Sequence, residues 1–166
     1  MNLNRRARLF FVWASLLTGL TCTQNLMAAS CSISSLGSLT NLSYDPMNGS
    51  PTLSAITFNI TCSGGGGGTI ATVRSIALSI GQSTTATNFT TRIMKLNDNL
   101  SYQLYQDSQR TVVWGDGTGG SFANTATYTF TNGQTRNFTI YVKIPAQNIY
   151  SGTYTVTPGP QITITW

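Results

Sequence analysis

The residues that could do chemistry in this chain are four aspartates and three cysteines, because glutamate and histidine are absent. Without histidine, the sequence cannot build a Ser-His-Asp or Cys-His catalytic set. A pair of carboxylates would suffice for glycoside hydrolysis. Each aspartate, however, stands in a turn-like setting, where its side chain accepts hydrogen bonds from nearby backbone amides: Asp45 before Pro46, Asp98 in "NDN", Asp107 in "QDSQ" and Asp116 in "GDGTG". We therefore expect turn residues here, and a protein that is not an enzyme.

Cofactor and metal sites are not expected either. Gly64 to Gly68 follow a strand pattern, but neither a helix pattern nor a Lys-Ser/Thr pair comes after them, as a phosphate-binding loop requires. The stretch "GDGTGG" supplies one carboxylate, whereas calcium takes several oxygen ligands. Two cysteines without histidine cannot complete a zinc site. Both glycine-rich stretches are therefore interpreted as loops.

The beginning of the chain has the layout of a signal peptide. Three arginines in "RRAR" precede an apolar run from Leu9 to about Leu20. Polar residues and glycine interrupt this run, so it does not predict a membrane anchor. We place cleavage after Ala28 or Ala29, and favour an ordinary Sec signal over the twin-arginine route or a lipidated "AASC". The predicted division is a signal peptide over 1–29 and one domain over 30–166.

Removal of this leader changes both the charge and the cysteine count. The formal charge falls from +5 to +2, because Arg5, Arg6 and Arg8 leave with the leader, and a nucleic-acid partner loses its main support. Cys22 leaves as well, so Cys31 and Cys62 remain as a pair in an exported chain. A disulfide between them is the natural interpretation, and it would stabilise the fold by about 3 to 4 kcal/mol.

The remaining residues predict an all-β fold. No stretch shows helical periodicity over three turns, whereas apolar and polar residues alternate in several short segments separated by Gly, Asn, Asp and Pro clusters. In "LSAITFNITC", Cys62 shares a face with the apolar residues, so we expect the disulfide to join core-facing positions. This pattern indicates a single β-sandwich. The predicted strands cover 53–62, 75–80, 100–105, 126–130, 137–144 and 162–166.

Several motifs together resemble the spore coat protein U family, which includes the subunits of archaic, Csu-type chaperone–usher pili. They are Cys31 directly after the leader, "YDP" (Tyr44, Asp45, Pro46), "ITFNITCSG", "YVKIPAQNIYSGTYTV" and the terminal "ITITW". The most specific block runs from Leu100 to Gly117 and contains Tyr102, Leu104, Tyr105, Asp107, Arg110, Trp114, Gly115 and Asp116.

The resemblance implies an immunoglobulin-like β-sandwich that lacks its last strand, so that a partner must add one. It implies a periplasmic chaperone, an outer-membrane usher and neighbouring pilus subunits as partners. The chain would pass through the periplasm to the cell surface and act in attachment or biofilm formation. Ile162, Ile164 and Trp166 would line the strand-acceptor groove, and basic residues of the chaperone would anchor the Trp166 carboxylate.

Two features depart from the family pattern. Only one or two residues separate the predicted cleavage site from Cys31, so the mature chain would accept a strand without donating one, as at a terminal position of a fibre. Pro158 and Pro160 interrupt the final strand and require a bulge, an edge position or a turn.

Other interpretations stay open at this point. One is an ordinary last strand in a complete sandwich, and others are a spore- or cyst-coat protein or a stand-alone carbohydrate-binding module. The aromatic residues Tyr150, Tyr154 and Trp114 could contact a surface or a sugar, although the core is the commoner place for such side chains, as it is for Tyr128 and Phe130.

Overall fold

The regular secondary structure of the chain is almost entirely β-strand in the computed structural model, which describes residues 28–34, 41–79, 89, 92–155 and 159–166. A short 3-10 turn, η1 (Pro46–Asn48), lies between the second and the third strand. The strands are β1 (Ser30–Ser34), β2 (Asn41–Tyr44), β3 (Thr52–Ser63), β4 (Thr69–Val73), β5 (Ser75–Leu78), β6 (Arg92–Lys95), β7 (Asn99–Tyr105), β8 (Tyr128–Thr131), β9 (Gln134–Ile144), β10 (Gly152–Thr155) and β11 (Ile162–Thr165).

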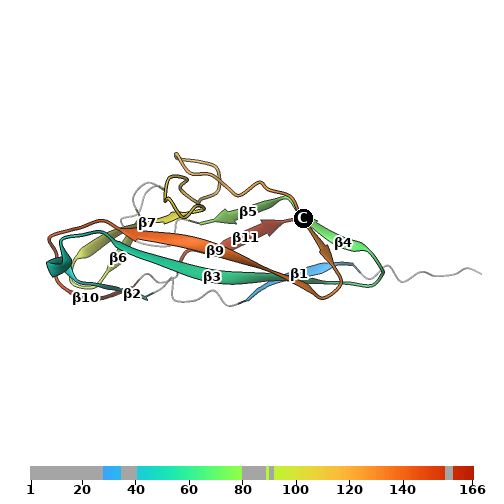
Figure 1. Cartoon of the computed structure of the whole chain (residues 1–166), viewed down its shortest axis with the longest axis horizontal. Helices are drawn as coiled ribbons and strands as arrows, with labels where there is room; N and C mark the ends of the chain where they lie inside the picture. Colours follow the sequence, from blue (N-terminus) through green and yellow to red (C-terminus); the bar gives the residue numbers. More distant parts are fainter. Residues whose placement is uncertain (1–27, 35–40, 80–88, 90–91, 156–158) are drawn as a thin grey trace, which may run out of the picture.

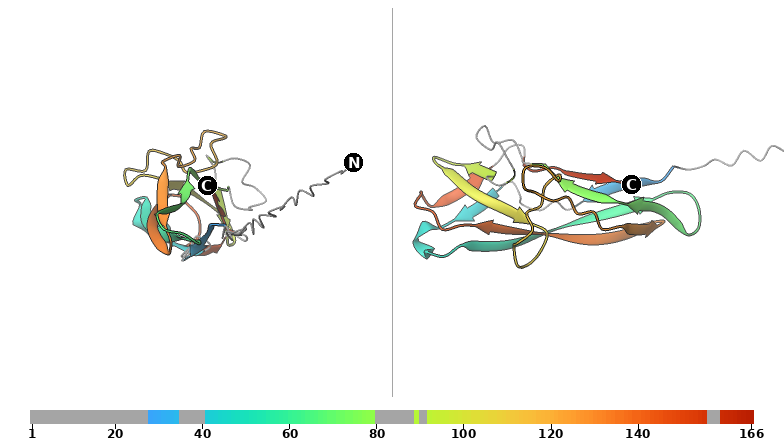
Figure 2. Two further views of the ribbon diagram at one scale, coloured as in Figure 1. Left: turned by 90° about the vertical axis from the view of Figure 1, so that its right-hand side faces the viewer. Right: turned by 90° about the horizontal axis from the view of Figure 1, so that it is seen from above.

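The strands form one large sheet and two small ones. The large sheet has the order β1-β3-β9-β7-β6-β10-β2, and the pairs β5–β11 and β4–β8 form separate two-stranded sheets. All strand pairs are antiparallel. The molecule is elongated, with β3 and β9 along most of its length (Figure 1), and the end-on view shows that the sheets curl around a common interior (Figure 2).

The core follows the predicted alternation along the strands. In β3 the side chains of Phe58, Ile60 and Cys62 are buried, and their neighbours in the sequence are not. The longest ladder joins β3 to β9 from Thr52↔Ile144 to Cys62↔Gln134. The buried residues of β5, β7 and β9 continue the same core: Ile76, Leu78, Leu100, Tyr102, Leu104, Phe138, Ile140, Val142 and Ile144. The all-β class is therefore confirmed, while Ile80, which we expected on the inner face of the second strand, lies outside the described residues.

The disulfide joins two strands at directly opposed positions. Cys31 of β1 and Cys62 of β3 are register partners, with their Cα atoms 4.1 Å apart. Cys62 is buried and Cys31 packs against the core, as the sequence predicted. The bridge therefore fastens β1 to β3.

The predicted turns are also present. Asp45 caps η1 by accepting a hydrogen bond from the Met47 N–H, and Gly49 closes the turn with a φ of 60°. Gly133, with a φ of 73°, turns the chain from β8 into β9. A residue with a Cβ would be strained at either position.

The end of the chain is divided into two strands. β10 lies in the large sheet, whereas β11 pairs with β5 in a separate sheet. Residues 156–158, and with them Pro158, lie outside the described residues, and Pro160 is buried between the two strands. The interruption predicted from the prolines is therefore a passage from one sheet to another, and β11 has an edge position.

Candidate functional site

The aspartates hold loops together. Asp107 accepts hydrogen bonds from the Thr111 and Val112 N–H groups and from the Thr111 hydroxyl, and Asp116 accepts from Thr118. Asp98 lies in the β6–β7 turn, where its carbonyl accepts from the Leu96 N–H. Within the described residues, no group of three or more Cys, His, Asp or Glu side chains is placed to hold a metal ion. The side chains of Asp45, Asp107 and Asp116 thus have the turn role that the sequence predicted, and Asp98 lies in a turn and accepts a hydrogen bond through its backbone carbonyl.

These hydrogen bonds shift the acidity of two carboxylates. Partial desolvation alone would raise the pKa of Asp107, but the hydrogen bonds from Val112 and Thr111 outweigh it, so the pKa lies below its ordinary value. The Thr118 hydroxyl is the main cause of the lowered pKa of Asp116. Asp107 is half-buried and Asp116 is exposed. The hydrogen bonds stabilise the carboxylate form of both side chains.

The most specific family block consists of most of β7 and the loop that follows it, and Arg110 attaches this loop to the large sheet. Arg110 has a φ of 59°, unusual for a residue with a side chain, and its guanidinium donates to the Val142 and Ser54 carbonyls. The same group lies over the Tyr141 ring, 5.7 Å from its centroid. Arg110 therefore ties this loop to the paired strands β3 and β9.

Other residues of the block lie in the core. Trp114 is buried, and its indole N–H donates to the Ile76 carbonyl over 2.9 Å. Gly115 follows, and a Cβ at this position would collide with Ser121 and Phe89. Tyr102 and Leu104 are buried, and Tyr105 is half-buried. These residues of the block therefore have a structural role, in packing the core.

Tyr44 of the "YDP" motif fixes the connection between β9 and β10. Its hydroxyl donates to the Gln147 carbonyl and accepts from the Gln147 N–H. The side-chain amide of Gln147 in turn pairs with both backbone groups of Ser101 in β7. Pro46 follows as the first residue of η1.

Arg92 is a buried cation that sequence reasoning missed. It donates to Gln103 Oε1 at 2.5 Å and to the Trp114 carbonyl at 2.7 Å. Burial lowers the pKa of Arg92 to about 10, and burial raises the pKa of its cross-strand neighbour Tyr102 to about 12. Among the described residues, neither Arg92 Nε nor the Tyr102 hydroxyl has a hydrogen-bond partner. Arg92 joins β6, β7 and the loop after β7, which is a structural role.

Among the strands that pair on one edge only in the described part of the chain are β1 and β11. β1 pairs only with β3, and β11 pairs only with β5. Figure 2 shows both strands on the side of the molecule opposite β9. We call these two edges the open edges.

The open edges border apolar side chains that are incompletely covered. Ile33 of β1 and both Ile162 and Ile164 of β11 pack against the core but remain partly exposed. Their neighbours, Ser32 and Thr163, face solvent. Trp166 follows β11 and is 52% exposed. The structure therefore places two of the three predicted acceptor residues on an open edge, with inward side chains, and Trp166 beyond the end of the strand.

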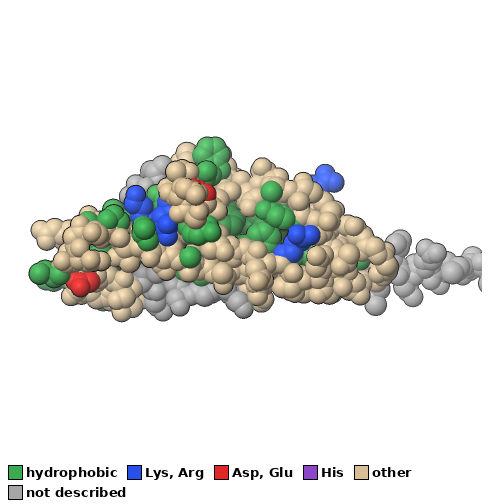
Figure 3. All heavy atoms as spheres, in the orientation of Figure 1, with side chains coloured by type: hydrophobic (Ala, Val, Ile, Leu, Met, Phe, Trp, Pro, Cys, Tyr) green, Lys and Arg blue, Asp and Glu red, His purple; other side chains and the backbone are tan. Residues whose placement is uncertain are grey.

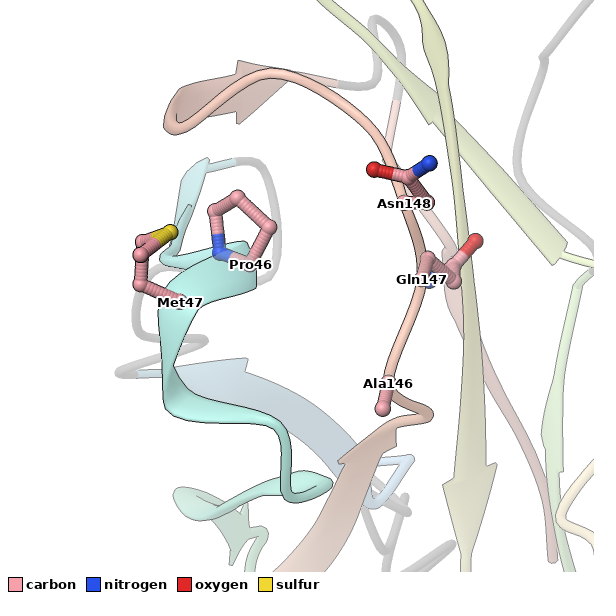
Figure 4. A pocket seen from close by; sticks show the side chains of 5 residues that line it. All are labelled: Pro46, Met47, Ala146, Gln147 and Asn148. Carbon is pink, nitrogen blue, oxygen red and sulfur yellow. The ribbon is translucent and has the colours of Figure 1, made fainter.

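At one end of the molecule, which we call the apolar end, two large apolar side chains are exposed near the turn residue Asp45. Met47 in η1 is 90% exposed, and Tyr150 in the β9–β10 connection is 67% exposed. Figure 4 shows an open pocket between Pro46 and Met47 on one wall and residues 146–148 on the other. Hydrophobic side chains are visible at this end on the left of Figure 3, and the C-terminus lies away from it (Figure 1).

The aromatic residues that the sequence offered as possible surface contacts differ in their burial. Trp114 and Tyr154 are buried. The hypothesis that either side chain contacts a surface or a sugar directly is therefore wrong. Phe130 is buried and Tyr128 is half-buried, and both pack with the core as expected. Tyr150 alone of these five is strongly exposed.

Comparison with known proteins assigns the family. No curated protein matches the chain. No helix among the described residues is long and apolar enough to cross a membrane. The family model described as the Spore Coat Protein U domain matches residues 17–158, a range that includes the "YDP" motif and the block from Leu100 to Gly117. The chain therefore belongs to the Spore Coat Protein U domain family.

Proposed function

We propose that this protein is an exported structural subunit of an archaic chaperone–usher fimbria that accepts a β-strand from another protein. The observation that carries the proposal is the pair of open edges, on β1 and β11, bordered by half-covered isoleucines. Unpaired backbone groups beside apolar side chains favour addition of a strand, in which main-chain hydrogen bonds give affinity and alternate side chains give selectivity.

The partners in this proposal act in sequence. A periplasmic chaperone covers the open edges first, because an uncovered apolar edge promotes aggregation. An outer-membrane usher then receives the subunit, and a neighbouring pilus subunit replaces the chaperone strand. In this scheme the leader directs export, and the Trp166 carboxylate is free to meet basic groups of the chaperone.

The apolar end supports a role in surface attachment. Met47 and Tyr150 expose large apolar side chains on loops that are fixed by the Tyr44–Gln147 contacts. Such side chains bind apolar surfaces by releasing water. We accordingly propose a terminal position in the fibre, with attachment and biofilm formation as its outcome.

A periplasmic pull-down tests the proposal. The protein is tagged directly after the predicted leader, so that the Trp166 carboxylate stays free, and captured from its native host for mass spectrometry. We expect a stoichiometric chaperone partner that is lost when Ile162 and Ile164 are both changed to Asp. The matched control changes Thr163 and Thr165 to Asp, because these side chains on the same strand face solvent, and it should retain the partner.

The opposite outcome is equally informative. A partner-free monomer that unfolds cooperatively on its own would mean that the sandwich is complete. The fimbrial proposal would then be abandoned in favour of a coat protein or a stand-alone binding module. Loss of the partner in the threonine control as well would show that added charge, not the isoleucine face, is responsible.

A further inference from the structure

The chain contains two Asn-Gly pairs, Asn48-Gly49 and Asn132-Gly133. This pair of residues favours spontaneous deamidation, because glycine has no side chain to hinder attack by its backbone nitrogen on the asparagine amide. Asn48 lies shortly before β3 and Asn132 shortly before the antiparallel β9, so the two pairs are at opposite ends of this ladder. Both asparagines are exposed, so exposure does not distinguish them and their hydrogen bonds must be compared.

Deamidation needs a free glycine nitrogen. This nitrogen attacks the Cγ atom of the asparagine, the Cγ–Nδ2 bond breaks, and ammonia leaves with the proton of the glycine N–H. The resulting succinimide ring then adds water and opens at either of its two carbonyls, which yields aspartate or isoaspartate. A hydrogen bond that holds the glycine N–H or the asparagine side chain must therefore break before the reaction.

Asn132-Gly133 is held by two such hydrogen bonds. Gly133 N–H donates to the Cys62 carbonyl over 3.0 Å, and Asn132 Oδ1 accepts from the Gly64 N–H over 3.1 Å. Cys62 is joined to β1 by the disulfide and stands opposite Gln134 at the end of the β3–β9 ladder. Attack at Asn132 therefore requires that the hairpin between β8 and β9 opens first, which costs free energy.

Asn48-Gly49 is held more weakly. It ends η1, a single 3-10 turn in which no residue is buried. Gly49 N–H donates to the Pro46 carbonyl over 3.4 Å, which is longer than the range of about 2.7 to 3.2 Å usual for such bonds. Within the described part of the chain, the Asn48 side chain makes no hydrogen bond. This turn therefore opens at a lower cost than the hairpin at Asn132.

We infer that Asn48 is a site of spontaneous deamidation, which converts a neutral side chain next to Met47 into a carboxylate at the apolar end. Met47 is 90% exposed and lines one wall of the pocket in Figure 4. A second carboxylate here, three residues after that of Asp45, must lose water when this end contacts an apolar surface, so the contact is weakened. The effect on attachment rests on the proposed function, whereas the modification itself does not.

Peptide mass spectrometry of aged protein tests the modification site. The unmodified protein is incubated at neutral pH, folded or unfolded in urea with its disulfide intact, and the loss of amide at Asn48 and Asn132 is followed with time. We expect Asn48 to deamidate more than about tenfold faster than Asn132 in the folded protein, and the two rates to agree within about threefold in urea. Equal rates in the folded protein would overturn the inference. A rate at Asn48 that falls more than about tenfold on folding would also overturn it, because η1 would then be protective.

Two aspartate variants test the effect at the apolar end. Asn48→Asp carries the charge of one product, whereas Asn132→Asp adds the same charge at the opposite end of the β3–β9 ladder and keeps the acceptor for the Gly64 N–H. On phenyl-agarose, we expect Asn48→Asp to elute earlier than the unmodified protein and the control Asn132→Asp to elute with it. Equal elution of all three proteins would overturn the effect on attachment. The deamidation rates decide the modification site separately, and the pull-down decides the strand-acceptor proposal.

Discussion

Gly115 of the family block has no room for a side chain. Its N–H and C=O are bonded to Phe122 and Leu78, and a Cβ would come within 2.7 Å of Phe89 and closer still to Ser121. We predict that Gly115→Ala lowers the free energy of unfolding by about 1 to 3 kcal/mol through overpacking. Chemical denaturation measures this, and Gly67→Ala is the control, because nothing lies within 4 Å of a Cβ there. Equal stability of the two variants would contradict the packing argument.

Asp107 makes the stability of the folded protein depend on pH through the hydrogen bonds of one loop. Its pKa in the folded state is lowered, so its hydrogen bonds contribute stability above the unfolded value of about 3.9, and this contribution is lost as the pH falls through the folded pKa. We predict that Asp107→Asn makes the decrease in melting temperature below about pH 4 shallower than in the unmodified protein.

Circular dichroism melts across this pH range provide the measurement for Asp107. Thr111→Val removes only the hydroxyl donor and keeps both backbone donors. It should therefore reduce the slope less than Asp107→Asn. An identical pH profile for all three proteins would rule out this loop as a source of the dependence.

The two long strands could be predicted from the sequence, whereas only some of the short ones, β5, β8 and β11, could. β3 and β9 alternate over many residues, so their faces were evident. The strands that were not predicted from the sequence, among them β1, β2, β6 and β10, have four or five residues. β6 also places Arg92 in the core, against the expectation for a charged residue. Tertiary pairing, which is non-local, decides these short strands.

β1 depends on its disulfide more than any other element does. Its only ladder in the described residues is with β3. We predict that Cys31→Ser with Cys62→Ser lowers the free energy of unfolding by about 3 to 4 kcal/mol. The loss should be accompanied by faster amide exchange in β1, while the β3–β9 ladder stays protected. Uniformly faster exchange across both ladders would show instead that the bridge stabilises the whole fold and not this strand.

At the scale of the molecule, the candidate site arises from residues far apart in the sequence. Ile162, Ile164 and Trp166 were named through the family resemblance, and the structure adds β1, about 130 residues earlier. Nothing local in "SCSIS" predicts an open edge beside the last strand. Gln147 and Arg92 were missed for the same reason, because their hydrogen bonds join distant segments.

The whole molecule should associate with itself when no partner is present. Only 8% of the residues are charged, so little repulsion opposes pairing of one open edge with another. We predict oligomers of the unmodified protein in sedimentation velocity at micromolar concentration, and a monomer for the variant in which Ile162 and Ile164 are both changed to Asp. A monomer in both cases would mean that the open edges are not adhesive.

The β3–β9 ladder has a mechanical consequence. It pairs 11 consecutive positions, about 36 Å at 3.3 Å per residue, along the long axis of the molecule. A pulling force along that axis shears all of these hydrogen bonds at once, whereas a force across it would unzip them one at a time. The disulfide adds a covalent bond between β1 and the β3 strand of this ladder. A molecule held at β1 and pulled along its length would therefore resist extension.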